Sequence, residues 1–125
     1  MNFFEAGIER TGDAVCLQAG PVRLDLPPQK AAQLGDYPHP SVTVGIRPED
    51  LQLAADPAVG QTITASVEVV EPIGNETYIN VNAGTFALIA AVGRKSRVES
   101  HQSVHLQPSL ATLHLFDAKT EKALP

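Results

Sequence analysis

Glycine and proline interrupt this chain along its whole length, and this constrains the fold more than any other feature. Nineteen of the 125 residues are Gly or Pro, and they separate short runs rich in Val, Ile and Thr, which total 26 residues. β-Branched residues favour strands, whereas Gly and Pro favour turns. A parallel α/β fold needs crossover helices, and no segment has the pattern of a long helix. The sequence therefore predicts an all-β protein built from short strands.

Period-two alternation marks several runs as half-buried strands. In VRLDL at 22–26 the first, third and fifth residues are apolar, and the two between them are charged. An alternating run at 15–19 precedes it across Gly-Pro, so the two runs are predicted to form a hairpin. One short helix is expected at 29–34, and a break in a long strand is expected at 71–75. Further strands are expected at 42–46, 63–70, 78–82, 86–92, 104–106 and 113–116.

About nine or ten short strands at near-regular spacing indicate a small β-barrel or a pair of barrels. Val, Leu, Ile and Phe make up 34 of the 125 residues, which is enough for a small hydrophobic core. If the barrel is divided into two lobes, they are expected to meet near 54–62, where Pro and Gly mark a loop.

Charge, cysteine and hydropathy restrict the partners and the compartment. The net charge of −5 and the pI near 5.2 disfavour nucleic acid as the main partner. The basic cluster 94–97 is interpreted as a solvated turn. Cys16 has no partner for an internal disulfide and is expected to be a small core residue on the apolar face of its strand. No apolar run reaches 18 residues and the first residues lack a signal-peptide pattern, so a cytoplasmic domain is expected.

Catalytic signatures are missing from the sequence. A P-loop needs Gly directly before Lys, whereas the four lysines follow Gln, Arg, Ala and Glu. No serine lies in the Gly-x-Ser-x-Gly setting of a nucleophile elbow. His101 and His105 would share a strand face, but Glu99 is the one nearby group that could join them as a metal ligand. The chain is therefore predicted to be no enzyme and to hold no metal or cofactor.

Two segments carry more special residues than folding alone requires, VGIRPEDL at 44–51 and VVEPIGNET at 69–77. A glycine in mid-strand indicates a bulge or the close approach of another backbone. The candidate partner surface consists of Gly45, Arg47 and Glu49 from the first segment and Gly74, Asn75, Glu76 and Thr77 from the second. An alternative of equal weight is that both segments are conformational devices that close a barrel.

These segments, with both ends of the chain, resemble a known family. Met1-Asn2-Phe3-Phe4, the run at 44–51, VEVVEPIGNETYINV at 67–81 and LHLFDAKTEKAL at 113–124 are similar, in this order, to motifs of one region. That region is the C-terminal TOBE part of the ATP-binding subunit of bacterial sugar and glycerol-phosphate ABC importers of the maltose type. The resemblance covers nearly the whole chain.

This chain departs from the family pattern in two turns. The family often has Gly near Glu121, and Gly before the last long strand, where this chain has His101-Gln102. The larger departure is that no nucleotide-binding domain precedes Met1 in the sequence given.

The resemblance implies a double OB-like β-barrel that holds two ATPase subunits together and receives regulatory proteins, at the inner face of the cell membrane. ATP and Mg²⁺ would belong to the ATPase domain, and importer membrane subunits would be indirect partners. Two alternatives stay open. Related domains in molybdate systems bind oxyanions, for which Asn75, Thr77 and the 94–97 turn are candidates. An OB barrel can also bind single-stranded nucleic acid, with Tyr37, Tyr78 and Phe86 as stacking residues; no such binding is expected.

Overall fold

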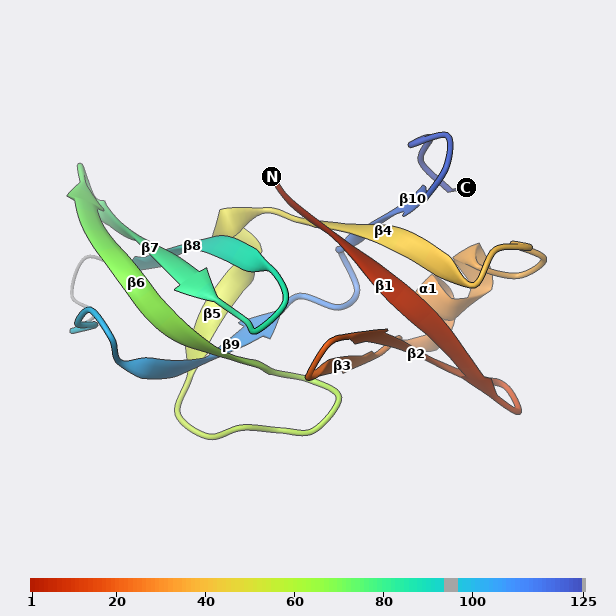
Figure 1. Ribbon diagram of the computed structural model, residues 1–125, viewed down its shortest axis with the longest axis horizontal. Coiled ribbons are helices and arrows are strands. Elements are labelled where there is room, and N and C mark those ends of the chain that lie inside the picture. The colour runs from red at the N-terminus through yellow and green to blue at the C-terminus, as the bar shows by residue number, and fades with distance from the viewer. Residues whose placement is uncertain (94–96, 125) are drawn as a thin grey trace.

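The chain folds into two antiparallel five-stranded sheets that lie side by side along the long axis of the molecule (Figure 1). The computed structural model describes residues 1–93 and 97–124. The first sheet has the order β10-β4-β1-β2-β3, and the second has the order β5-β9-β6-β7-β8. The strands are β1 (Asn2–Thr11), β2 (Ala14–Ala19), β3 (Val22–Asp25), β4 (Ser41–Ile46), β5 (Leu51–Ala54), β6 (Ile63–Ile73), β7 (Glu76–Asn82), β8 (Ala87–Gly93), β9 (Ser103–Pro108) and β10 (His114–Asp117). The all-β, OB-like architecture predicted from the sequence is confirmed.

The second sheet is inserted into the first. The chain leaves the first sheet after β4 through the one-turn 3₁₀ helix η1 (Pro48–Asp50), and it returns after β9 to add β10 beside β4. The loop 55–62 joins two strands of the second sheet and also reaches the first, because the carbonyl of Gly60 accepts a hydrogen bond of 2.7 Å from the amide of Asp25. The division into two lobes near 54–62 stays a prediction.

One hydrophobic core spans both sheets. Alternate positions of each strand point inward, so apolar side chains from every part of the chain meet in a single cluster. The largest fully buried side chains are Leu17, Leu24, Leu34, Ile46, Leu51, Ile63, Ile79, Leu88, Leu106 and Leu113. The short helix α1 (Pro28–Gln33) begins with proline and ends beside the buried Leu34. No helix in the described part of the chain has the length and apolar character needed to cross a bilayer.

The predicted strands and the hairpin across 20–21 are confirmed, but alternation missed two strands. β1 went unpredicted because its inward positions are Asn2, Phe4 and Ala6 while the outward Phe3 is also apolar, so its pattern does not alternate cleanly. β5 has only four residues, and one of its exposed positions is Leu53. A short strand with mixed faces gives too weak a periodic signal to be recognised.

The expected break at 71–75 is wrong in extent, because β6 continues to Ile73 and pairs Pro72 with Thr77. β9 pairs with β6 only through Ser66, so the outer edge of β6 is open beyond the bulge at Glu68. In a two-residue hairpin the two residues that flank the turn, here Ile73 and Glu76, exchange both backbone hydrogen bonds. The backbone N–H and C=O of the residue before them therefore point away from the partner strand. The nitrogen of Pro72 therefore faces the open edge, where no donor is needed.

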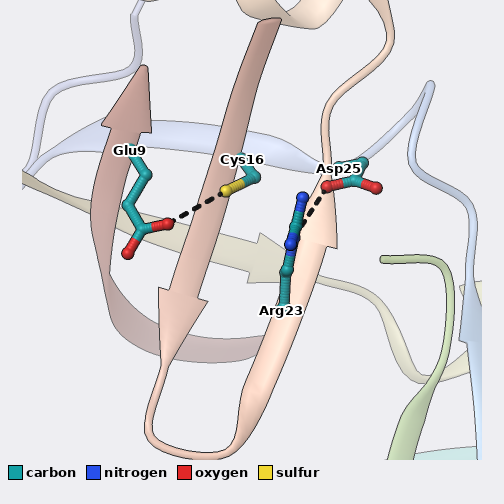
Figure 2. Close-up of polar contacts among 4 residues, drawn as sticks. All are labelled: Glu9, Cys16, Arg23 and Asp25. Carbon is teal, nitrogen blue, oxygen red and sulfur yellow. Dashed lines mark hydrogen bonds and ion pairs between the residues drawn. The ribbon is translucent and has the colours of Figure 1, made fainter. Parts of the chain in front are cut away.

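Cys16 is buried as expected, but it lies on the opposite face of its strand. Val15 and Leu17 enter the core, so the period-two pleat turns Cys16 to the outer face, between Glu9 on β1 and Asp25 on β3 (Figure 2). Its Sγ lies 3.5 Å from Glu9 Oε2. Burial, followed by the hydrogen bond to Glu9, raises the pKa of the Cys16 thiol, which disfavours a reactive thiolate.

A buried side-chain amide connects the two sheets near the N-terminus. Asn2 on β1 donates from Nδ2 to the carbonyls of Ile89, at 2.8 Å, and Ile46, at 3.1 Å. Its Oδ1 accepts from the Ile89 amide at 2.8 Å. β8 is an edge strand, so Asn2 satisfies both backbone groups of one edge residue, as a neighbouring strand would.

Candidate functional site

The first predicted segment divides between the core and the surface. Gly45 is buried in β4, where an added Cβ would lie 2.7 Å from Met1 Sδ and 2.9 Å from Phe116 Cε2. Side chains, rather than another backbone, therefore approach this glycine closely. Arg47 and Glu49 follow in exposed positions at η1, and neither takes part in an ion pair recorded among the described residues.

The second predicted segment forms the tip of the β6–β7 hairpin. Gly74 has φ of +61°, while Asn75 stays outside the left-handed region, which is the sign pattern of a type II′ turn. An added Cβ at Gly74 would meet no atom within 4 Å, so backbone conformation alone requires glycine here. Glu76 is exposed, whereas Thr77 is buried and therefore does not belong to the outer surface.

Tyr78 is the residue that links the two segments. Glu76 raises the pKa of Tyr78 by accepting a hydrogen bond from the phenol and by its negative charge, and Glu49 adds a smaller effect of its charge. η1 packs beside β8, where Glu49 borders a hollow of about 360 Å³ with Ala91 and Gly93. The fold thus brings Glu49 and Glu76 to one surface, but Gly45 lies elsewhere, in the first sheet.

Three exposed aliphatic side chains on the outer face of β6, β7 and β8 were missed by sequence reasoning. Val69, Ile73 and Ile89 keep 44 %, 55 % and 42 % of their surface exposed, and the register places them around Tyr78. The β-bulge at Glu68 shifts the pairing of β6 by one residue, which moves Val69 and Ile73 to the outer face. Period-two counting across the bulge could not have found them.

We expect the Glu76→Gln variant to show a Tyr78 pKa closer to that of free tyrosine. The amide keeps a similar shape but carries no charge to oppose phenolate formation. Absorbance titration of the phenolate measures this directly, because Tyr37 and Tyr78 are the two tyrosines in the chain. The matched Glu49→Gln variant is expected to lower the Tyr78 pKa by less. An unchanged titration in Glu76→Gln would contradict the contact.

The three aromatic residues considered for base stacking are not gathered on one surface. Phe86 stacks on Phe4, with ring centroids 4.3 Å apart, and packs against the core. Tyr37 also packs against the core and donates from its hydroxyl to the Ser41 carbonyl at 2.7 Å. Of the basic turn 94–97, Arg94 to Ser96 lie outside the described residues. Within the described ranges no three His, Cys, Asp or Glu side chains are grouped to hold a metal ion.

Sequence comparison identifies the family. The model of the "MalK OB fold domain" matches residues 1–51, which end at the crossing into the second sheet, and the model of the "TOBE domain" matches residues 44–116, more than half of the chain. The chain belongs to the TOBE domain family. This TOBE assignment agrees with the resemblance seen in the sequence.

Curated relatives of the TOBE chain include import ATP-binding proteins. It is 34 % identical over 124 residues to sn-glycerol-3-phosphate import ATP-binding protein UgpC 2 of Agrobacterium fabrum, covering 99 % of this chain and 31 % of the relative. It is 32 % identical over 130 residues to trehalose/maltose import ATP-binding protein MalK of Thermococcus litoralis, covering 99 % and 34 %. The TOBE chain thus spans about a third of the length of these relatives.

A solved structure of the cytoplasmic molybdate-binding protein ModG, with molybdate bound, has a similar fold. The TM-score is 0.67 with 12 % sequence identity, and the alignment covers 99 % of the TOBE chain and 96 % of the other. At this identity the likeness shows the fold alone.

Proposed function

We propose that this TOBE chain is the regulatory and dimerisation module of the ATP-binding subunit of a bacterial importer of sugars or glycerol phosphate. One observation carries the proposal: the whole chain aligns with relatives named as import ATP-binding proteins, yet it spans about a third of their length. On this proposal the ATPase domain lies in the remainder of the subunit, and the module works at the inner face of the membrane, where a regulatory protein can also bind.

We propose that the module contacts its second copy through the η1–hairpin surface, defined by Arg47, Glu49, Gly74, Asn75 and Glu76. This surface carries one cation and two anions, all exposed. A two-fold interface brings the same patch together from both copies, so a patch that carries both signs of charge can complement itself. Thr77 is left out because its side chain is buried, and Gly45 supports the first sheet instead.

We expect Arg47→Glu to weaken self-association of the chain by about tenfold, because it removes the one cation of the surface and adds a like charge. Sedimentation equilibrium measures the effect. The double variant Arg47→Glu/Glu76→Arg restores both signs and is expected to recover most of the loss. Arg10→Glu, on the first sheet, is the control. Equal effects of the two single substitutions, or no association of the unaltered chain, would contradict this surface.

The importer assignment is tested separately in the source cells. An antiserum raised against the chain is applied to membrane and soluble fractions. A membrane-associated band about three times heavier than 13.3 kDa is expected, because the chain spans about a third of its relatives. A soluble band near 13.3 kDa would instead favour a free-standing module.

The second candidate is a free-standing module that binds an oxyanion such as molybdate. The fold shared with the molybdate-binding protein favours it. The carboxylates of Glu49 and Glu76 near the hairpin oppose it, since they repel anions. Calorimetric titration with molybdate distinguishes the candidates, and strong binding would place the second one first.

A further inference from the structure

A pocket of about 350 Å³ opens on the outer face of the first sheet. Four residues line it: Phe3 of β1, Thr43 of β4, Phe116 of β10, and Glu121 of the turn that follows β10. Phe3 keeps 58 % of its surface exposed. The lining combines two aromatic rings, one hydroxyl and one carboxylate, and no residue of the sequence-predicted surface lines it.

The two rings lie over Gly45, where the absence of a side chain leaves room for them. Phe3 and Phe116 meet with ring centroids 5.7 Å apart and ring planes inclined at 63°. Both approach the missing side chain of Gly45, since an added Cβ there would lie 2.9 Å from Phe116 and 3.3 Å from Phe3. His114 stacks on Phe116 from the same strand. The absence of a side chain at Gly45 therefore allows Phe3 and Phe116 to pack on the sheet with their ring planes inclined to each other.

Glu121 supplies the carboxylate from a backbone conformation in which residues other than glycine are uncommon. Glu121 has φ of +62°, in the left-handed region that favours glycine. The conformation is fixed by two hydrogen bonds of 2.8 Å, from the Glu121 amide to the Asp117 carbonyl and from the Asp117 amide to the Lys122 carbonyl. Among the described residues the recorded ion pair is Arg23–Asp25, so Glu121 has no ion-pair partner there. The chain thus keeps a carboxylate on a strained backbone position at the pocket, where glycine would fold more easily.

We propose that this pocket binds the alkylated ammonium head of a small organic cation. The face of an aromatic ring attracts a cation, and a carboxylate beside it balances the charge. A trimethylammonium group is too bulky and too weakly hydrated to be bound by hydrogen bonds, so rings and a single anion are the groups suited to recognise it. The pocket lies on the first sheet and does not depend on the importer assignment.

Choline is the probe, and its neutral carbon isostere, with a tert-butyl group in place of trimethylammonium, is the matched control ligand. Amide proton–nitrogen spectra of the whole chain are recorded during titration at constant ionic strength. We expect choline to bind with a dissociation constant on the order of 1–10 mM. The shifts should centre on Phe3, Thr43, Phe116 and Glu121, and the isostere should bind at least about fivefold more weakly.

Three variants separate binding from folding. Glu121→Gln keeps the backbone strain but removes the charge, and should weaken choline about fivefold. Glu121→Gly should weaken choline binding as much as Glu121→Gln does. It should also raise the melting temperature by about 4 °C, because glycine relieves the backbone strain. His101→Gly is the control: His101 also has positive φ, at 70°, but lies in the turn before β9, so stability should rise without a change in binding.

The proposal is overturned by equal binding of choline and its isostere, by full binding in Glu121→Gln, or by shifts that centre away from the pocket. A lysine derivative blocked at both backbone ends is a further arm. If it binds more tightly than choline, the pocket is a site for a protein side chain, and the proposal of a small organic cation fails.

Discussion

Replacing Asn2 with alanine is expected to lower the free energy of unfolding by about 3 kcal/mol, which corresponds to a fall in melting temperature of about 10 °C. Three hydrogen bonds to Ile46 and Ile89 are lost at once. They lie where the edge of the second sheet meets β1, so the backbone groups of Ile89 also lose their partner. Chemical denaturation followed by circular dichroism measures the change.

Two further substitutions test the reason for this loss. Asn80→Ala is the control, because Asn80 is half-buried on the outer face of β7 and makes no side-chain hydrogen bond recorded among the described residues. It is expected to cost less than about 1 kcal/mol. Asn2→Asp keeps the acceptor for the Ile89 amide but turns an oxygen toward two carbonyls, so it should cost at least as much as alanine. If Asn2→Ala proves no worse than Asn80→Ala, the two sheets are held together without this amide.

Gly60→Ala is expected to destabilise the chain by about 3 kcal/mol. Gly60 has φ of +81°, and a Cβ there would overlap the carboxylate of Asp25. To make room, the Asp25 side chain must rotate out of its 3.1 Å pair with Arg23 (Figure 2), while the Asp25 amide stays bonded to Gly60. The substitution therefore disturbs the contact between loop 55–62 and β3, and the denaturation midpoint measures it.

Gly74→Ala provides the matched comparison, since its φ of +61° brings similar strain while no atom lies near the added methyl group. It should cost about 1 kcal/mol. The difference between the two variants then measures the overlap with Asp25. Combining Gly60→Ala with Asp25→Ala should recover part of the loss, and a purely additive double variant would show that backbone strain alone is responsible.

Much of the fold could be predicted because most strands bury one clean face. VRLDL at 22–26 and the hairpin across 20–21 are examples, since Leu24 enters the core and Arg23 faces solvent. Apolar–polar alternation does not reveal a strand in which a polar side chain occupies a buried position. Asn2 occupies an inward position of β1 because it serves the backbone of β8, and nothing within the local sequence reveals a partner 87 residues away.

The candidate site was predicted less well, because a surface forms from residues that lie close together in the fold but far apart in the sequence. Glu49 and Glu76 were both named from the sequence as surface residues, but their common neighbour Tyr78 was considered only for base stacking. Thr77 was predicted to lie on the surface. Side chains of a strand alternate between its two faces, however, so Thr77 points to the face opposite that of Glu76 and Tyr78. The pocket of Phe3, Phe116 and Glu121 depends on the pairing of β4 with both ends of the chain, which local pattern cannot supply.

The insertion of the second sheet into the first has a consequence for the order of folding during synthesis. β1 to β4 leave the ribosome first, but their sheet lacks the strand that covers the edge of β4 until residues 114–117 have been made. The contacts of β10 with β4 span about seventy residues of sequence, and pairings of such separation form slowly. During translation all strands of the second sheet can therefore be made before the first sheet is complete. The first sheet is completed last, when β10 pairs with β4.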